Sequence, residues 1–122
     1  MRCNIKKLIY TGYLGQEEVY IEVNRYDYGN GLCIQLNEMD EGYLIPYATL
    51  TVNLEGYDVP KYHAFLDTNN CPTAEQFVVS NGLGTSTGKY GRSGYCQYPL
   101  YEFNREKLLE YCPDGIAEYE KN

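Results

Sequence analysis

Tryptophan is absent from the 122-residue sequence, and histidine occurs once, at position 63. A single histidine excludes any metal site or catalytic group that needs two imidazole rings. The five cysteines are an odd number, are widely spaced and form no C-x-x-C pair, which is typical of reduced thiols. We therefore expect free thiols, no metal and no other cofactor.

Long apolar runs are also absent. The N-terminal segment has no apolar run of signal-peptide length, and no later segment approaches the roughly 18 apolar residues of a membrane span. The length fits one globular domain, residues 1–122, and is too short for two separate cores. We expect a cytoplasmic protein that makes no membrane contact.

Basic residues are few, because 17 acids outnumber 10 Lys and Arg residues and the formal net charge is −7. Proteins that bind nucleic acid neutralise phosphates with excess positive charge, so direct nucleic-acid binding is not expected. Three of the acids, Glu38, Asp40 and Glu41, lie close together in the sequence. This acidic cluster fits either a solvated turn or a patch that contacts a cationic partner.

Tyrosine, in contrast, is abundant, with 15 residues. It combines a large apolar face with a hydroxyl group and is enriched at interfaces, although it also covers small sheets with its hydroxyl in water. Two tyrosines, Tyr43 and Tyr47, are candidates for partner binding together with the acidic cluster. Several tyrosines are expected outside the core, on strand faces or beside a glycine-rich segment: Tyr20, Tyr43, Tyr47, Tyr90, Tyr95, Tyr98 and Tyr101.

Alternating apolar residues predict β-strands in the first half of the chain. Val19, Ile21 and Val23 share one face, and a glycine and asparagine turn follows, which predicts a hairpin. Pro46 cannot donate a ladder hydrogen bond, so the strand around it begins after this residue or lies at a sheet edge. The expected strands cover residues 7–13, 17–26, 32–36, 43–54 and 63–66.

Two short helices are predicted in the second half. A T-x-x-Q capping box that begins at Thr73 predicts a helix that ends at Gly82 or Gly84. A second helix runs from an N-cap at Asn104 to a stop at Pro113. The expected fold class is α+β, with an antiparallel sheet of about five strands in a meander and two short helices.

The segment NGLGTSTGKYGRSG, residues 81–94, contains five glycines, one lysine, one arginine and no acid. Its composition predicts a loop whose backbone N–H groups and two cations can hold an anion such as phosphate. The Walker pattern fails, because Leu83 replaces its first glycine and Tyr90 replaces its Ser or Thr. A structural surface loop is the alternative. The candidate ligand-binding residues are Ser86, Thr87, Lys89, Tyr90, Arg92, Ser93 and Tyr95.

No set of residues marks a catalytic centre, and we assign no catalytic residue. A thiol nucleophile, Cys71 or Cys96, can be paired with His63, and the same side chains with one more cysteine can be considered as zinc ligands. Nothing local in the sequence activates either thiol. We expect a noncatalytic protein, with a small cysteine-dependent enzyme as an alternative.

Several motifs between residues 66 and 104 carry a resemblance: DTNNCP, a helix ending in NGLG, TGKYGRSGYC and YPLYEFN, preceded by a YATLTVNL strand. Over residues 19–104 the chain is similar to a family of small proteins of unknown function found on conjugative elements and phages of gut bacteria. The resemblance implies a context, because small acidic proteins of mobile elements often blunt host immunity. Known modes are inhibition of CRISPR nucleases, antirestriction and sequestration of nucleotide signals.

Two functions are therefore expected from the sequence and the resemblance together. The first is a noncatalytic accessory protein for counter-defence that binds a host nuclease or immune complex through Glu38, Asp40, Glu41, Tyr43 and Tyr47. The alternative is a sponge that binds a phosphate-containing small molecule, such as a nucleotide, with the glycine-rich segment.

Overall fold

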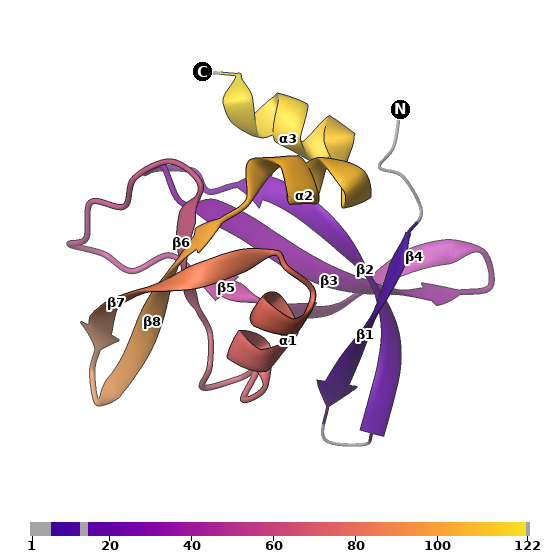
Figure 1. The fold of residues 1–122 in the computed structure, drawn as a ribbon, viewed down its shortest axis with the longest axis horizontal. Helices are drawn as coiled ribbons and strands as arrows, with labels where there is room; N and C mark the ends of the chain where they lie inside the picture. Colours follow the sequence, from indigo (N-terminus) through magenta and orange to yellow (C-terminus); the bar gives the residue numbers. More distant parts are fainter. Residues whose placement is uncertain (1–5, 13–14, 122) are drawn as a thin grey trace.

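The structure is a computed structural model that describes residues 6–12 and 15–121. In these residues the fold is α+β, with two antiparallel four-stranded sheets and three short helices (Figure 1). The α+β class is as expected from the sequence. The prediction of a single sheet of about five strands is wrong in detail, because the strands form two sheets.

The first sheet is a meander with the strand order β1-β2-β3-β4. Its central hairpin was expected from the alternating pattern, and Val23 of one strand lies opposite Ile34 of the other. Their side chains are buried, because alternate residues of these strands face the core. The four strands are β1 (Lys7–Gly12), β2 (Gly15–Arg25), β3 (Leu32–Asp40) and β4 (Tyr43–Thr49).

The chain passes from the first sheet to the second at Leu50, so the expected strand over residues 43–54 is interrupted. Leu50 is fully buried, and its N–H donates a 2.8 Å hydrogen bond to the carbonyl oxygen of Ile34. The strand before it, β4, contains Pro46 and lies at a sheet edge. An edge position was one of the two alternatives that the sequence allowed for this proline. Opposite this proline, the register of β3 shifts between Leu36 and Asn37.

The second sheet has the strand order β5-β6-β8-β7 and is antiparallel throughout. Most of the glycine-rich segment, expected to be a loop, forms the edge strand β7 of this sheet. Glycine is needed there for space, because a Cβ at Gly91 would lie 2.7 Å from both Leu54 Cδ1 and Phe65 Cε1. The strands are β5 (Thr51–Val52), β6 (His63–Leu66), β7 (Gly84–Ser93) and β8 (Cys96–Phe103).

The helices are α1 (Ala74–Ser80), α2 (Arg105–Tyr111) and α3 (Pro113–Glu120). The N-cap at Asn104 is confirmed, because its side chain accepts a 3.2 Å hydrogen bond from the N–H of Lys107. Thr73 does not cap α1, because its hydroxyl donates instead to the carbonyl oxygen of Thr11. The helix that follows Asn104 ends before Pro113, as expected, but Pro113 also starts the unexpected helix α3, since proline is well suited to a first helical turn.

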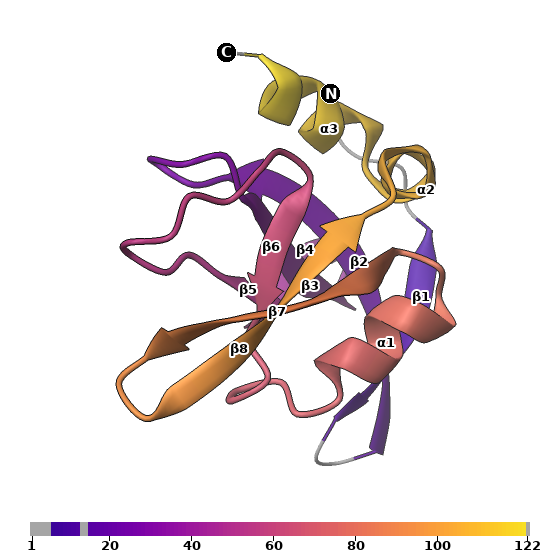
Figure 2. The same cartoon turned by 60° about the vertical axis from the view of Figure 1, so that its left-hand side comes forward.

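Both sheets and all three helices contribute to one main core cluster. Figures 1 and 2 show α2 and α3 together at one end of the molecule, and α1 beside β7. The contact of α3 with β2 is close, since a Cβ at Gly115 would lie 2.4 Å from the carbonyl oxygen of Val23. Two tyrosines expected outside the core, Tyr98 and Tyr101, are buried.

No helix in the described part of the chain combines the length and the apolar character needed to cross a membrane.

Candidate functional site

The candidate partner-binding residues lie mainly on one projecting hairpin, which we call the β3–β4 tip (residues 38–45). Glu41 and Gly42 form its turn, with φ values of 50° and 87°. Two successive positive φ values are the geometry of a tight two-residue hairpin turn. In Figure 1 this hairpin extends away from the body of the molecule, on the side opposite the β7–β8 hairpin.

The β3–β4 tip exposes apolar side chains next to its acids. Met39 lies opposite Leu44, and these side chains are 42% and 39% exposed. Asp40 lies opposite Tyr43, which is 74% exposed. Because successive residues of a strand point to opposite faces, the Met39 pair and the Tyr43 pair occupy different faces of the hairpin. Both faces of the tip therefore offer apolar contact area.

The acids of the β3–β4 tip carry negative charge that no ion pair within the described part of the chain neutralises. Among the described residues, the ion pairs involve other carboxylates, such as Glu18, Glu110 and Glu120, and none involves Glu38, Asp40 or Glu41. The exposed aromatic and aliphatic side chains are thus rimmed by unpaired carboxylates, an arrangement suited to a cationic protein surface.

Tyr47 lies further along β4 and is not part of the β3–β4 tip. Its half-buried ring packs against Tyr10, with ring centroids 6.0 Å apart and an interplanar angle of 70°. The structure therefore places the ring of Tyr47 against Tyr10 rather than on the β3–β4 tip with the other four candidate partner-binding residues.

Part of the glycine-rich segment lines a second candidate site, which we call the Lys89 pocket. Its volume is about 370 Å³, within the usual range for small-molecule sites. Three of the seven candidate ligand-binding residues meet there: Thr87, Lys89 and Tyr90. The other lining residues are Tyr57, Asp58, Val59, Pro60, His63, Phe65 and Leu100.

The backbone of β7 around this pocket is already hydrogen-bonded within the chain. The N–H of Gly88 donates to the hydroxyl of Ser86 at 3.1 Å, and the N–H of Lys89 donates to the hydroxyl of Thr87 at 3.1 Å. The N–H of Arg92 donates to the Tyr57 hydroxyl at 2.8 Å. An anion in the Lys89 pocket would therefore be bound by side chains rather than by a backbone cradle.

The other candidate residues of the glycine-rich segment lie outside the Lys89 pocket. Ser93 ends β7, and Tyr95 stands fully exposed in the turn between β7 and β8. Ser86 and Arg92 lie on the same edge strand with exposed side chains. Within the described residues neither Lys89 nor Arg92 takes part in an ion pair, so both cations are available to a ligand or partner.

His63 and the two cysteines proposed as nucleophiles do not come together in the Lys89 pocket or in the pocket that contains Cys71. It lines the Lys89 pocket, whereas Cys71 lines a pocket between β1 and β4 and Cys96 lines neither. Burial raises the pKa of the Cys71 thiol, and this effect outweighs a hydrogen bond from Tyr10 that lowers it. Burial therefore disfavours the thiolate that a nucleophile requires.

The cysteines do not all match the expectation of reduced thiols. Cys33, Cys71 and Cys96 are free, but Cys112 is disulfide-bonded, and Cys3 lies outside the described residues. Among the residues that the structure describes, no three His, Cys, Asp or Glu side chains are grouped so that they could hold a metal ion.

Comparison with known proteins places the chain in a family. Residues 20–122 match DUF4313, a domain of unknown function, so the chain belongs to this family. No curated protein and no solved structure matches the chain. The site is therefore interpreted from its own geometry.

Proposed function

We propose that this DUF4313 domain is a noncatalytic accessory protein that binds a protein partner through the β3–β4 tip. The observation that supports the proposal is the exposure of Met39, Tyr43 and Leu44 on a projecting hairpin beside three unpaired acids. The motif resemblance described above suggests a mobile element or phage as the source. We accordingly propose a counter-defence role in the cytoplasm, against a host nuclease or another immune complex.

Two parts of the β3–β4 tip would contribute differently to such a contact. Tyr43 would anchor the complex, because a large aromatic side chain that becomes fully buried at an interface is a common hot spot. Glu38, Asp40 and Glu41 would steer the tip toward positive charge, such as the nucleic-acid channel of a nuclease. A net charge of −7 is modest for a mimic of a whole DNA segment, so the contact would be local.

The test compares two triple variants with equal charge. One variant neutralises the tip (Glu38→Gln, Asp40→Asn, Glu41→Gln), and the control neutralises exposed acids elsewhere (Asp27→Asn, Glu55→Gln, Glu102→Gln). Proteins recovered from host lysate by the wild type are purified, and their affinities for all three chains are measured at low and high salt. The tip variant should bind more weakly than the wild type, and its affinity should no longer depend on salt. The control should keep the affinity and the salt dependence of the wild type.

A Tyr43→Ala variant tests the anchor separately from the charges. Loss of a hot-spot tyrosine typically weakens a complex by about 30-fold or more, without changing its dependence on salt. Wild-type affinity in both the Tyr43→Ala variant and the tip charge variant would contradict the proposal.

A second candidate function, binding of a phosphate-containing small molecule, is supported by the convergence of Thr87, Lys89 and Tyr90 on the Lys89 pocket. Lys89 would pair with the phosphate, and Tyr90 would stack on a base. Thermal-shift screening against nucleotides and cyclic dinucleotides tests this function. Arg92→Ala is the matched control, since Arg92 does not line the pocket. A stabilising ligand should lose its effect in Lys89→Ala and keep it in Arg92→Ala; equal loss in both would contradict the assignment.

A further inference from the structure

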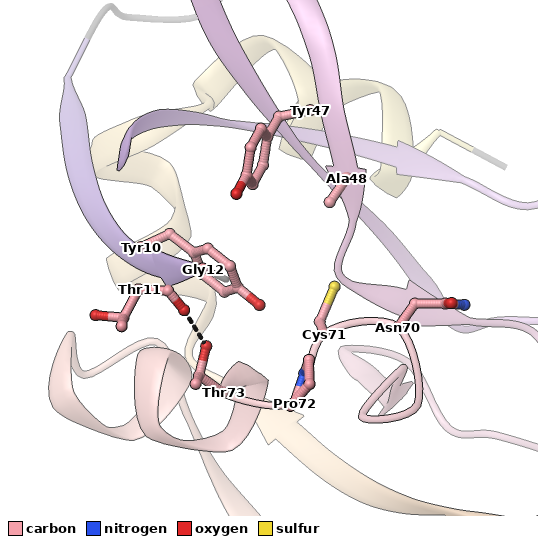
Figure 3. A pocket seen from close by; sticks show the side chains of 9 residues that line it. All are labelled: Tyr10, Thr11, Gly12, Tyr47, Ala48, Asn70, Cys71, Pro72 and Thr73. Carbon is pink, nitrogen blue, oxygen red and sulfur yellow. Dashed lines mark hydrogen bonds between the residues drawn. The ribbon is translucent and has the colours of Figure 1, made fainter. Parts of the chain in front are cut away.

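A different pocket, which we call the Tyr10–Tyr47 pocket, lies where the two edges of the first sheet approach each other. β1 and β4 are the outer strands of this sheet, yet Tyr10 and Tyr47 are in ring contact at 6.0 Å. The sheet must therefore curl strongly. Residues 70–73, which lead into α1, lie across the gap (Figure 3). The pocket is open to solvent on one side and has a volume of about 330 Å³.

Two tyrosines and a cysteine shape the interior of this pocket. Figure 3 shows Tyr47 entering from β4 and the hydroxyl of Tyr10 pointing toward Cys71. The tyrosine rings meet at 70°, so they form a corner against which a flat ring can pack on two sides. The thiol of Cys71 is 3.6 Å from the carbonyl oxygen of Thr49, and the hydroxyl of Thr73 is held at 2.7 Å by the carbonyl oxygen of Thr11.

Gly12 leaves room in the pocket that any other residue would occupy. A Cβ at this position would lie 2.6 Å from the Tyr47 hydroxyl, and the backbone of Gly12 does not adopt a positive φ. The glycine is thus explained by space beside Tyr47 rather than by conformation. Among the described residues the Tyr47 hydroxyl has no hydrogen-bond partner, so it is available to a molecule in the pocket.

The pocket is uncharged at neutral pH. The described residues that line it include no Asp, Glu, Lys, Arg or His: they are Tyr10, Thr11, Gly12, Tyr47, Ala48, Asn70, Cys71, Pro72 and Thr73. Burial raises the pKa of Tyr10 to about 12 and also raises the pKa of the Cys71 thiol, so both groups stay protonated. For Tyr47, burial and then the nearby charges of Glu17 and Glu38 raise the pKa, so its hydroxyl also stays protonated.

We propose that the Tyr10–Tyr47 pocket binds an uncharged aromatic small molecule that carries a hydrogen-bonding group such as an amide. The ring would pack in the tyrosine corner, and the polar group would reach the Tyr47 hydroxyl. Anions are disfavoured, because the pocket offers no cation and the surrounding carboxylates repel negative charge. No residue of the β3–β4 tip or of the Lys89 pocket lines this site, although Glu38 of the tip lies near the Tyr47 hydroxyl, and the site does not depend on the proposed partner contact.

The test uses a matched pair of probes, benzamide and benzoate, which share a ring and differ in charge. Each is titrated into the ¹⁵N-labelled protein at pH 7 while amide chemical shifts are recorded. Benzamide should shift the amides of Gly12, Ala48, Cys71 and Thr73, and benzoate should bind there at least about tenfold more weakly. Absence of benzamide shifts at these residues, or equal binding of benzoate, would overturn the proposal.

Two variants then test the geometry. Gly12→Ala should abolish benzamide binding because the new methyl group drives Tyr47 out of place. Gly31→Ala should not, because its Cβ would lie at an ordinary 3.5 Å from the His63 carbonyl oxygen. If Gly12→Ala does not fold, Tyr47→Phe provides the test, since loss of one hydroxyl should weaken benzamide roughly 2- to 10-fold. Wild-type affinity in a folded Gly12→Ala variant, or in Tyr47→Phe, would refute the assignment.

Discussion

Replacement of Gly115 by alanine tests how closely α3 packs on β2. In an exposed helix this change is favourable by about 1 kcal/mol, because alanine is the better helix former. Here the new Cβ would lie 2.4 Å from the carbonyl oxygen of Val23 and 2.7 Å from the sulfur of Cys112. An ordinary contact begins at 3.4 Å, so α3 must move by roughly 3.4 − 2.4 = 1.0 Å.

The expected loss of stability follows from these two opposing effects. Overpacking of a core typically destabilises a protein by about 1 to 3 kcal/mol. We expect a cost of about 3 kcal/mol here, because the new Cβ meets strand backbone, which cannot rotate away as a side chain can. After subtraction of the helix gain, the net loss is about 2 kcal/mol. At about 2.1 cal/mol/K per residue, unfolding of 122 residues has an entropy of about 0.26 kcal/mol/K, so the Tm should fall by about 8 °C.

The measurement is the thermal unfolding of the wild type, Gly115→Ala and the control Gly31→Ala by circular dichroism. The control places its Cβ at van der Waals distance from its neighbours, so its Tm should stay within about 2 °C of the wild type. A Gly115→Ala variant as stable as the wild type, or more stable, would show that α3 does not approach β2 this closely.

Three further predictions concern stability and reactivity. Hydrogen bonds from Arg105 and Tyr62 lower the pKa of Glu120 to about 2 from an ordinary value of 4.5, so the stabilisation is complete above pH 4.5 and is lost as the pH falls toward 2. In urea titrations across this range, wild-type stability should decline more steeply than that of Glu120→Gln; parallel declines would contradict this. Asn104→Ala should remove the cap of α2 and lower the free energy of unfolding by about 1 kcal/mol, whereas Asn104→Ser should retain most of it. Iodoacetamide at pH 7 should modify Cys71 at least about tenfold more slowly in the folded protein than in urea, as followed by peptide mass spectrometry, and equal rates would argue against a buried thiol.

Local signals predicted those parts of the fold that local forces determine. The alternation at Val19, Ile21 and Val23 identified a strand, because one face of β2 is buried and the other is not. The cap at Asn104 identified the start of α2, because the capping bond joins residues only three positions apart.

The failures came from long-range packing. Nothing near Leu50 marks it as the point where the chain changes sheets, because its position follows from burial between both of them. Glycines usually weaken strands, so the sequence predicts a loop where β7 forms. Gly91 is explained only by Leu54 and Phe65, which come from elsewhere in the chain.

The candidate sites also differ in whether local sequence or long-range packing forms them. The acidic cluster located the β3–β4 tip, because a hairpin turn and its flanking residues are contiguous in sequence. The role of Tyr47 could not be predicted, since its pocket is completed by Tyr10 and Cys71 from distant segments. Gly12 also belongs to this pocket, but the sequence alone does not explain why a glycine is needed there. The reason becomes clear only in the structure, where the Tyr47 hydroxyl occupies the space of a Cβ.

The contact of α3 with β2 also has a consequence for biosynthesis. The N–H of Val23 donates to the sulfur of Cys112, and these residues are 89 positions apart. Hairpins of the first sheet can form while the chain is still being translated, before α2 and α3, which follow both sheets in the sequence, have left the ribosome. Until α3 has formed, the inner face of β2 lacks part of its cover, so we expect this stage of folding to be the one most prone to aggregation.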